Sequence, residues 1–337
     1  MKRVRRGASQ GQLVEFGFHL PGRGPLARPS ILARLARKAD ALGYACITVS
    51  DHVVLPTKSS APYPYSPTGE FPGGSRQDYL EPLALMAWLL GVTRRIRVGT
   101  SVLVVPYRNP VVTAKQLATL DALSGGRVIV GCGVGWWPEE FQALAAPPFA
   151  ERGAVTDEYL QLMKELWTRD EPRFAGKYYH VSDVTMFPKP AQKPHPPIWI
   201  GGHTDRALRR VGELADAWHP IGLRAPARLT PDEYAEKAQQ VRAHAARAGR
   251  RSDAILLTLR APLEIWPRQR TRAPAGVQVQ GSPLRGPAEK VIRDIRAYTR
   301  AGVRFFVFDF TEQDPKAMVE TMERFAEEVR PKVARAR

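Results

Sequence analysis

Asp51 and His52 stand together directly after a short apolar run, 45–49, and form the most chemically capable pair in this sequence of 337 residues. A histidine beside a carboxylate can act as a general base, donate a hydrogen bond to a ligand ring, or bind a metal. A purely structural pair is the alternative. The other histidines are scattered and form no carboxylate–histidine cluster with ligand spacing, so we expect no metal site.

A second candidate is the loop Gly201-Gly202-His203-Thr204, which follows an apolar run and precedes a helical pattern at 205–214. Glycines expose backbone N–H groups, and a helix N-terminus favours negative charge, so the loop suits a phosphate. Three arginines follow it, at 206, 209 and 210. The alternative is a tight turn whose arginines face solvent.

The run Gly131-Cys132-Gly133-Val134-Gly135 has the glycine spacing of a dinucleotide-binding turn. That motif needs a helix opening at once and an acidic residue on the next strand. Trp136, Trp137 and Pro138 follow instead, and no such acid is apparent. A Rossmann site is therefore disfavoured, and the absence of GxxxxGK[ST] and HExxH argues against P-loop NTPases and zincins.

The polar residues Thr100 and Ser101 precede Val102 inside a strand pattern, 96–105, that is otherwise apolar. Hydroxyl groups in a buried parallel strand need partners, which indicates a bulge or a ligand contact at this point. Hydrogen bonds to neighbouring backbone are the alternative.

Apolar runs alternate with segments of helical periodicity along the chain. Strands are expected at 13–19, 45–49, 96–105, 127–132, 197–200, 217–219, 254–263 and 305–308. Helices are expected at 30–42, 80–90, 111–123, 152–167, 205–214, 231–248, 287–301 and 315–329. Eight alternations predict an α/β fold, a (β/α)8 TIM barrel, over a doubly wound sheet with fewer units. The candidate residues would then share the C-terminal face of the barrel.

The remaining segments are expected to be loops and a tail. Residues 1–12 are basic and read as a mobile tail, and 13–337 read as a single domain. Substrate identity is expected to lie in the irregular segments at 55–77, 136–150 and 264–283, since long loops in compact domains are commonly functional. A hairpin is expected within 174–190.

The composition is that of a globular protein, with 44% hydrophobic and 25% charged residues and a net charge of +17. No apolar run approaches the ~18–20 residues of a membrane span, and the N-terminus lacks a signal-peptide core. Cys46 and Cys132 lie in strand-like runs, so we expect buried free thiols and a cytoplasmic protein. Basic residues are spread along the chain without a nucleic-acid module, so no specific nucleic-acid or membrane partner is expected.

Four stretches together resemble the luciferase-like monooxygenase superfamily, and within it the coenzyme F420-dependent oxidoreductases. They are ITVSDHVVLP (47–56), the segment 95–136, AERGAVTDEYLQLMKELW (150–167) and PPIWIGGHTDRALRRVGELADAW (196–218). The resemblance covers about 13–220 well and 284–310 more loosely. It implies a TIM barrel with insertion loops and a flavin or deazaflavin lying across the C-terminal mouth.

The resemblance also implies roles for individual residues. It implies a non-prolyl cis peptide at Ser101–Val102, in a bulge against the cofactor ring, and a ring-contacting histidine at His52 with Asp51 beside it. Further cofactor contacts would be made by a glycine wall, a phosphate loop and two helix residues near the cofactor tail: Gly133 and Gly135; Gly201, Gly202 and His203; Arg152 and Tyr159.

One departure from the family pattern concerns the substrate. Relatives that oxidise sugar phosphates carry a glutamate after the Gly-x-Gly, where this chain has Trp136 followed by Trp137. An apolar or aromatic substrate is therefore favoured over a sugar phosphate. Glu139 and Glu140 follow a proline and are interpreted as helix-starting residues.

Three functional hypotheses follow. The favoured one is a coenzyme F420-dependent oxidoreductase that transfers hydride between the deazaflavin C5 and a small organic substrate, with His52 as the catalytic residue. The alternative is an FMN-dependent monooxygenase supplied with reduced flavin by a partner reductase. A non-catalytic polyanion binder is the third, and it predicts salt-dependent DNA binding. A homodimer is expected in the enzyme hypotheses.

Overall fold

The computed structural model describes residues 13–222, 226–251, 253–266, 283–310 and 313–334. Eight parallel strands close a barrel in which each strand pairs with the next in the chain and the last pairs with the first. The strands are β1 Glu15–His19, β2 Cys46–Val49, β3 Arg97–Thr100, β5 Val128–Gly133, β8 Ile198–Ile200, β9 Ala217–Trp218, β10 Leu256–Ile265 and β12 Phe305–Phe310. The predicted TIM barrel is confirmed.

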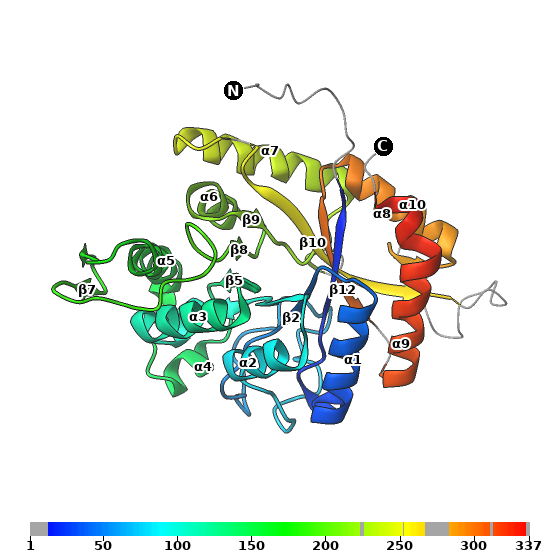
Figure 1. Ribbon diagram of the computed structural model, residues 1–337, viewed down its shortest axis with the longest axis horizontal. Coiled ribbons are helices and arrows are strands. Elements are labelled where there is room, and N and C mark those ends of the chain that lie inside the picture. Colours follow the sequence, from blue (N-terminus) through cyan, green and yellow to red (C-terminus); the bar gives the residue numbers. More distant parts are fainter. Residues whose placement is uncertain (1–12, 223–225, 252, 267–282, 311–312, 335–337) are drawn as a thin grey trace.

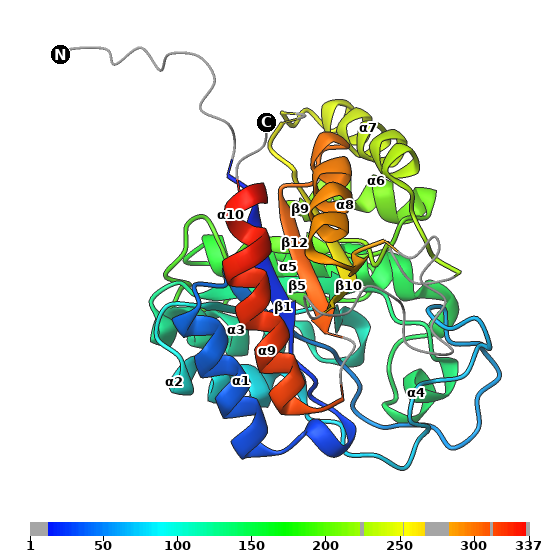
Figure 2. The ribbon, with the colours of Figure 1, turned by 90° about the vertical axis from the view of Figure 1, so that its right-hand side faces the viewer.

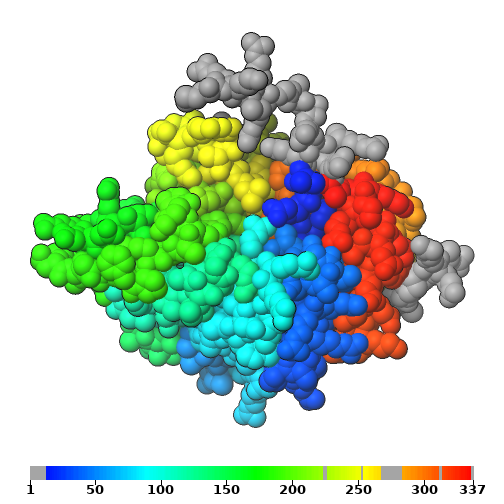
Figure 3. Space-filling model, in the orientation of Figure 1, coloured from blue at the N-terminus to red at the C-terminus, as the bar shows by residue number. Residues whose placement is uncertain are grey.

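Four short strands supplement the barrel. β4, Leu103–Val104, continues the course of β3 and pairs with β5, and β11, Arg285–Gly286, pairs with β10. β6 Phe174–Ala175 and β7 His180–Val181 form a small antiparallel hairpin. This hairpin lies in the green part of the chain that projects from the side of the molecule (Figures 1 and 3).

Helices surround the barrel (Figure 1). They are α1 Pro29–Ala41, α2 Pro82–Val92, α3 Pro110–Ser124, α4 Pro138–Ala143, α5 Arg152–Thr168, α6 Asp205–Leu214, α7 Pro231–Arg247, α8 Ala288–Arg300, α9 Pro315–Arg324 and α10 Arg330–Val333. A π-helical turn, Phe325–Val329, joins the last two. Figure 2 shows α1 beside α9 on the outside of β1, so the two ends of the described chain meet there.

Local sequence signals explain where several helices begin. Thr230 caps α7 through a capping box with Glu233, and Asn109 accepts hydrogen bonds from two backbone N–H groups at the start of α3. Each of these helices also has proline at its first position, where the missing N–H costs nothing. Helix starts were therefore readable from the sequence to within about two residues.

The side chains that face the barrel interior change character along the strands. An apolar cluster of Cys46, Ile129, Trp199, Ala217, Phe305 and Val307 fills one part of it. Further along the interior the buried residues are polar, and five of them are joined by hydrogen bonds: Ser101, His219, Thr258, Arg260 and Asp309. The outward faces of the strands pack on the helices in a larger apolar core. One part of the barrel interior is thus lined by polar side chains.

The structure corrects three details of the sequence reading. The strand expected at 96–105 is divided into β3 and β4, because the chain bulges between them. The segment 136–150, expected to be irregular, contains the short helix α4, whose first turn holds Glu139 and Glu140 as interpreted from the sequence. The last helix, expected to run through 315–329, is α only to Arg324 and then widens to the π-helical turn. Residues 1–12 and 267–282, the expected tail and most of the second long loop, lie outside the described residues.

Candidate active site

The sequence-predicted residues converge on one end of the barrel. His52 follows β2, Ser101 follows β3, Gly201 follows β8, and Gly133 ends β5. Parallel strands in a barrel deliver their C-terminal ends to a single face, which is where active sites of this fold lie. Asp309, near the end of β12, lies at the same end of its strand.

The bulge after β3 has the geometry that the resemblance implied. The peptide bond between Ser101 and Val102 is cis, which confirms that prediction. The Val102 side chain lies against two of the predicted glycines: a Cβ on Gly133 would collide with its Cγ2, and a Cβ on Gly201 would lie 3.2 Å from its Cγ1. These glycines therefore make room for the bulge itself. Their contact with a cofactor stays a prediction.

Gly135 has a different reason to be glycine. Its φ is +83°, and an added Cβ would lie 2.8 Å from Val104 Cγ1 and 2.6 Å from the Phe141 ring. Both the backbone conformation and the close packing exclude a side chain there. The wall predicted for Gly133 and Gly135 is thus built by packing around β4 and α4.

A buried polar network supports the bulge from inside the barrel. Thr258 Oγ1 donates to the Trp218 carbonyl (2.9 Å), so it accepts from His219 Nδ1 (2.6 Å). His219 Nε2 is then the acceptor for the Ser101 hydroxyl (2.8 Å). Arg260 Nη1 donates to the Ser101 carbonyl (2.5 Å). These bonds fix both the carbonyl and the hydroxyl of Ser101 in place.

The same network predicts an acid-sensitive stability. Burial, and secondarily the Arg260 charge, lower the pKa of His219 from 6.5 to about 3. Between these two pKa values His219 is protonated in the unfolded chain but neutral in the folded chain. The free energy of unfolding therefore falls as the pH drops from about 6.5 towards 3. The His219 contribution to this slope is at most about 1.4 kcal/mol per pH unit.

Urea denaturation at a series of pH values measures this slope. His219→Gln is expected to be less stable at pH 7 and to show a shallower pH dependence below 6.5. His180→Gln, at an exposed position of β7, serves as the control and should keep the wild-type slope. Equal slopes in wild type and His219→Gln would contradict the assignment.

His52 is held by a buried glutamate from α4. Glu140 is fully buried, and its Oε2 lies 2.6 Å from His52 Nδ1. The same carboxyl accepts from the Tyr107 hydroxyl (2.9 Å) and from the backbone N–H groups of Val53 (2.7 Å) and Val54 (3.3 Å). A carboxylate only accepts, so Nδ1 carries the proton and Nε2 is left to meet a ligand.

Tyr107 is kept in its donating form. Burial, and then the negative charge of Glu140, raise its pKa far above the ordinary value of 10. The phenol therefore stays protonated and donates to Glu140. This role of Glu140 was not predicted from the sequence. Glu140 does lie in the first turn of α4, as interpreted, but it also orients His52. No local pattern connects residues 88 positions apart.

Asp51 is occupied by protein groups. Its two oxygens accept from Arg108 Nη1 (2.7 Å) and Nη2 (2.8 Å), and one also accepts from the Val104 N–H (2.8 Å). Arg108 reaches on to Glu81 at the start of α2 (2.8 Å). Asp51 thus connects the end of β2 to β4, and its contact with a cofactor stays a prediction.

The predicted phosphate loop adjoins a half-buried arginine. Gly202 has a φ of +88°, and Thr204 caps α6 by accepting from the Ala207 N–H. Arg152 stacks over the Phe149 ring at 3.9 Å and donates to the Phe149 carbonyl. Its Nε is buried and, among the described residues, has no hydrogen-bond partner. An N–H donor left without an acceptor here fits an anionic ligand.

Charges around this loop are mostly positive. Burial lowers the pKa of Arg152, and the nearby Arg206 charge lowers it further. Burial and Lys237 lower the pKa of His203, while Glu233 acts in the opposite direction. Like charges held close together favour the binding of a polyanion between them.

The other arginines of the loop motif are used for structure. Arg210 pairs with Asp157 and donates to the Gly153 carbonyl (3.0 Å), and Arg209 pairs with Glu213 (3.2 Å). Arg206, the first of the three arginines that follow the glycines, lies close enough to Arg152 for its charge to lower the pKa of Arg152. Tyr159, predicted to reach the cofactor tail, is buried in the core with its ring against Tyr179 (centroids 6.1 Å apart).

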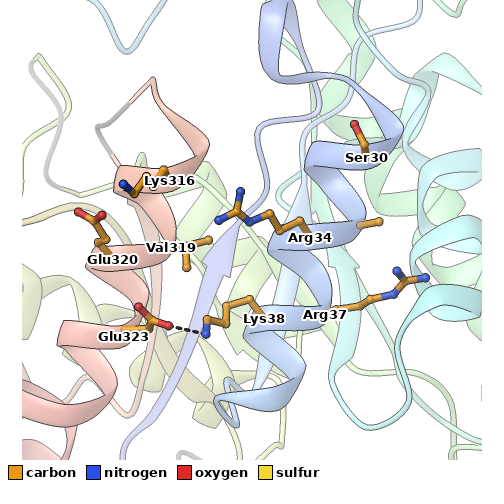
Figure 4. A pocket seen from close by; sticks show the side chains of 9 residues that line it. Ser30, Arg34, Arg37, Lys38, Lys316, Val319, Glu320 and Glu323 are labelled. Atoms are coloured by element: carbon orange, nitrogen blue, oxygen red, sulfur yellow. Dashed lines mark ion pairs between the residues drawn. The ribbon is translucent and has the colours of Figure 1, made fainter.

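A separate hollow lies on the outer surface between α1 and α9 (Figure 4). It has a volume of about 820 Å³ and is lined by Arg34, Lys38, Lys316 and Glu320 among others, with an ion pair between Lys38 and Glu323. It lies on the helix layer and contains none of the predicted site residues. Within the described residues, no group of His, Cys, Asp or Glu has the arrangement of a metal site.

The comparisons with known proteins agree with this geometry. A family model described as luciferase-like monooxygenase matches residues 14–265. The chain belongs to the luciferase-like monooxygenase family. Members of this family are flavin- or F420-dependent oxidoreductases and monooxygenases. No described helix of this family member is long and apolar enough to cross a membrane.

Three similar proteins differ in their identity to this chain and in the share of it that they cover. An uncharacterized protein of Mycobacterium tuberculosis (strain ATCC 25618 / H37Rv) is 38% identical over 208 residues, 61% of this chain and 66% of its own length. An FMNH2-dependent dimethylsulfone monooxygenase of Pseudomonas putida is 36% identical over 141 residues, 41% of this chain and 38% of its own. The structure of an F420-dependent secondary alcohol dehydrogenase has a TM-score of 0.75 at 18% identity, covering 95% of this chain and 99% of the other.

Proposed function

We propose that this family member is a coenzyme F420-dependent oxidoreductase that transfers hydride between the deazaflavin C5 and a small organic substrate. The observation that carries the proposal is the cationic cradle at the phosphate loop: Arg152 with an unpartnered Nε, Arg206, His203 and Lys237. A phospholactyl–polyglutamate tail offers several negative charges to such a surface, whereas FMN offers one phosphate. The F420-dependent dehydrogenase of the same fold agrees with this choice.

The residues present fit such a cofactor. Glycines at 201 and 202 leave the backbone bare beside the cationic cradle, and the Ser101–Val102 bulge is braced from below by His219 and Arg260. We assign Gly201, Gly202, His203 and Arg152 to the phosphate and tail, and Ser101, Val102 and His52 to the ring. The deazaflavin, when bound, supplies the hydride chemistry.

The protein's own part in the reaction is proton handling and orientation. Glu140 fixes the proton of His52 on Nδ1, so Nε2 can receive a proton from a substrate hydroxyl during oxidation. In the reverse direction Nε2–H donates that proton to the oxygen formed by reduction of a carbonyl. Because Glu140 is fully buried and accepts four hydrogen bonds, the His52 ring is already oriented before the reaction begins in either direction.

Titration of the purified protein with F420 and with FMN tests the proposal. Binding is measured through the fluorescence of each cofactor. We expect F420 to bind at least tenfold more tightly than FMN, and its affinity to fall as the salt concentration rises. Arg152→Met is expected to weaken F420 at least tenfold. Arg209→Met, already paired with Glu213, is the matched control. Tighter binding of FMN, or no effect of Arg152→Met, would contradict the assignment.

The FMN-dependent monooxygenase is the second candidate. It is favoured by the 36% identity to the FMNH2-dependent enzyme of Pseudomonas putida. That reaction class takes reduced flavin from a separate reductase and consumes O2, so O2 uptake in the presence of a flavin reductase and FMN measures it directly.

We also propose a cytoplasmic homodimer. Both cysteines are buried free thiols, which suits a reducing compartment. α2 is apolar around its whole circumference, and its outer side leaves Trp88 36% exposed beside Ala84 and Ala87. Light scattering is expected to give twice the chain mass, and Trp88→Asp to give the monomer.

A further inference from the structure

Aromatic rings from two separate segments meet around His52. Phe71 and Tyr79 come from the long loop between β2 and α2, and Trp136 and Trp137 follow β5. Their ring centroids lie 5.1, 5.1, 6.1 and 5.6 Å from that of His52, each in edge-on contact. The two tryptophans stack at 4.6 Å, with Phe71 against both. His52 is therefore enclosed by flat apolar surfaces.

These rings are not a closed core. Phe71, Tyr79 and Trp136 are half-buried, as is Tyr63, which contacts both Phe71 and Trp136. Flat aromatic surface left partly open at the active-site end of a barrel is the usual lining of a site for an apolar ligand. Offset and edge-on ring contacts also favour aromatic ligands over saturated ones of equal size.

The charged groups next to His52 are already paired. Asp51 is bound by Arg108, which also pairs with Glu81, and Glu140 is bound by His52 and Tyr107. A phosphate or carboxylate on the substrate would not reach Arg108 without breaking a buried pair. Arg23 lies over the Phe71 ring, 5.6 Å from its centroid, and donates to the Pro72 carbonyl. The part of the cluster next to His52 therefore suits an uncharged group.

One donor inside the cluster is unused. Trp137 is 2% exposed, and its Nε1 has no hydrogen-bond partner among the described residues. An indole N–H can only donate, and a buried donor without an acceptor is rare because its desolvation is uncompensated. His52 Nε2, in the adjacent ring, likewise makes no hydrogen bond within the described chain.

From these observations we infer that the substrate is a flat, uncharged aromatic molecule with one carbonyl or hydroxyl oxygen, bound by the Trp137 indole N–H beside His52. The ring system packs on Phe71 and Trp136. The oxygen accepts from Trp137 and lies where His52 exchanges a proton. The inference rests on the proposed function only for the reaction; the binding of the oxygen and the ring is independent of it.

The test uses three ligands of one shape and the full-length protein without cofactor. 2-Acetylnaphthalene carries the ring and the oxygen, 2-isopropenylnaphthalene replaces the oxygen by CH2, and 2-acetyldecalin is the saturated analogue. Calorimetric titration is expected to give at least about tenfold tighter binding of 2-acetylnaphthalene than of either analogue, since one hydrogen bond is worth roughly that factor.

Paired tryptophan variants then separate the two contributions. Trp137→Phe keeps a ring but loses the N–H, and should abolish the preference for oxygen over CH2 while retaining the preference for the aromatic ring. Trp136→Phe is the matched control and should keep both preferences. Phe71→Leu should reduce only the aromatic preference.

The outcomes decide the inference without reference to turnover. Equal affinities of the three ligands for the wild-type protein would overturn it even if none of the three variants folded. A preference for oxygen that survives in Trp137→Phe would remove Trp137 as the donor and indicate that a water satisfies it. Selective binding without any F420- or FMN-linked turnover would overturn the proposed function and leave this inference standing.

Discussion

Replacing Glu140 by glutamine is expected to lower turnover by roughly 10²- to 10⁴-fold, the range contributed by a positioned acid–base group. Four donors converge on the two Glu140 oxygens: His52 Nδ1–H, the Tyr107 hydroxyl and the N–H groups of Val53 and Val54. Glutamine has one acceptor oxygen and brings two N–H donors. With its oxygen on the backbone N–H groups, its amide nitrogen faces His52 and forces the proton to Nε2.

The measurement is the pH profile of kcat together with cofactor affinity. Glu140→Gln should reduce kcat and move or flatten the profile, whereas the affinity for cofactor should change by less than about threefold, because Glu140 acts on the proton of His52. Glu139→Gln is the matched control: Glu139 lies on the same turn of α4 but accepts hydrogen bonds from Ser60 and not from His52. A Glu140→Gln enzyme with wild-type kcat would show that His52 needs no orienting carboxylate.

Replacing Arg260 by methionine is expected to destabilise the fold by about 3–5 kcal/mol, the usual cost of breaking one side of a buried ion pair. The side chains of Arg260 and Asp309 are 10% and 7% exposed, and the guanidinium binds Asp309 Oδ1 at 2.8 Å. Methionine leaves the Asp309 carboxylate buried without its guanidinium and removes the donor to the Ser101 carbonyl.

Chemical denaturation at neutral pH measures this loss. The double variant Arg260→Met with Asp309→Leu should recover a large part of the stability, because no buried charge remains. Arg251→Met provides the control, since the side chains of its pair with Asp253 are 83% and 68% exposed and such pairs contribute little to stability. A loss below about 1 kcal/mol for Arg260→Met would mean that water reaches Asp309.

Much of the fold was readable because its signals are local. Helix α6 runs over 205–214, as expected from apolar spacing and from Thr204 as its cap. The strand–helix alternation that predicted the barrel needs only the periodicity of each segment. Of the two hydroxyls in this apolar strand, Thr100 donates to the Gly131 carbonyl of the neighbouring strand, which was the alternative, and Ser101 lies at the bulge.

The site was readable only in part. Strand ends placed His52, Ser101 and Gly201 on one face, and the family resemblance gave the cis peptide at Ser101–Val102. The resemblance also suggested cofactor contacts for Gly133 and Asp51. In the structure both residues have structural roles: Gly133 makes room for Val102, and Asp51 binds Arg108. Whether either also touches a cofactor stays a prediction.

By itself, the sequence determined the barrel, the face on which chemistry would occur, and an aromatic rather than acidic residue at position 136. Those properties depend on patterns within some 5 to 20 neighbouring residues, where steric and hydrogen-bond preferences act. Only the tertiary structure decided that Glu140 orients His52, that Arg260 and His219 brace Ser101, and that Arg210 is taken by Asp157. Such pairings depend on which side chains the closed barrel brings within about 3 Å, a distance that periodicity does not encode.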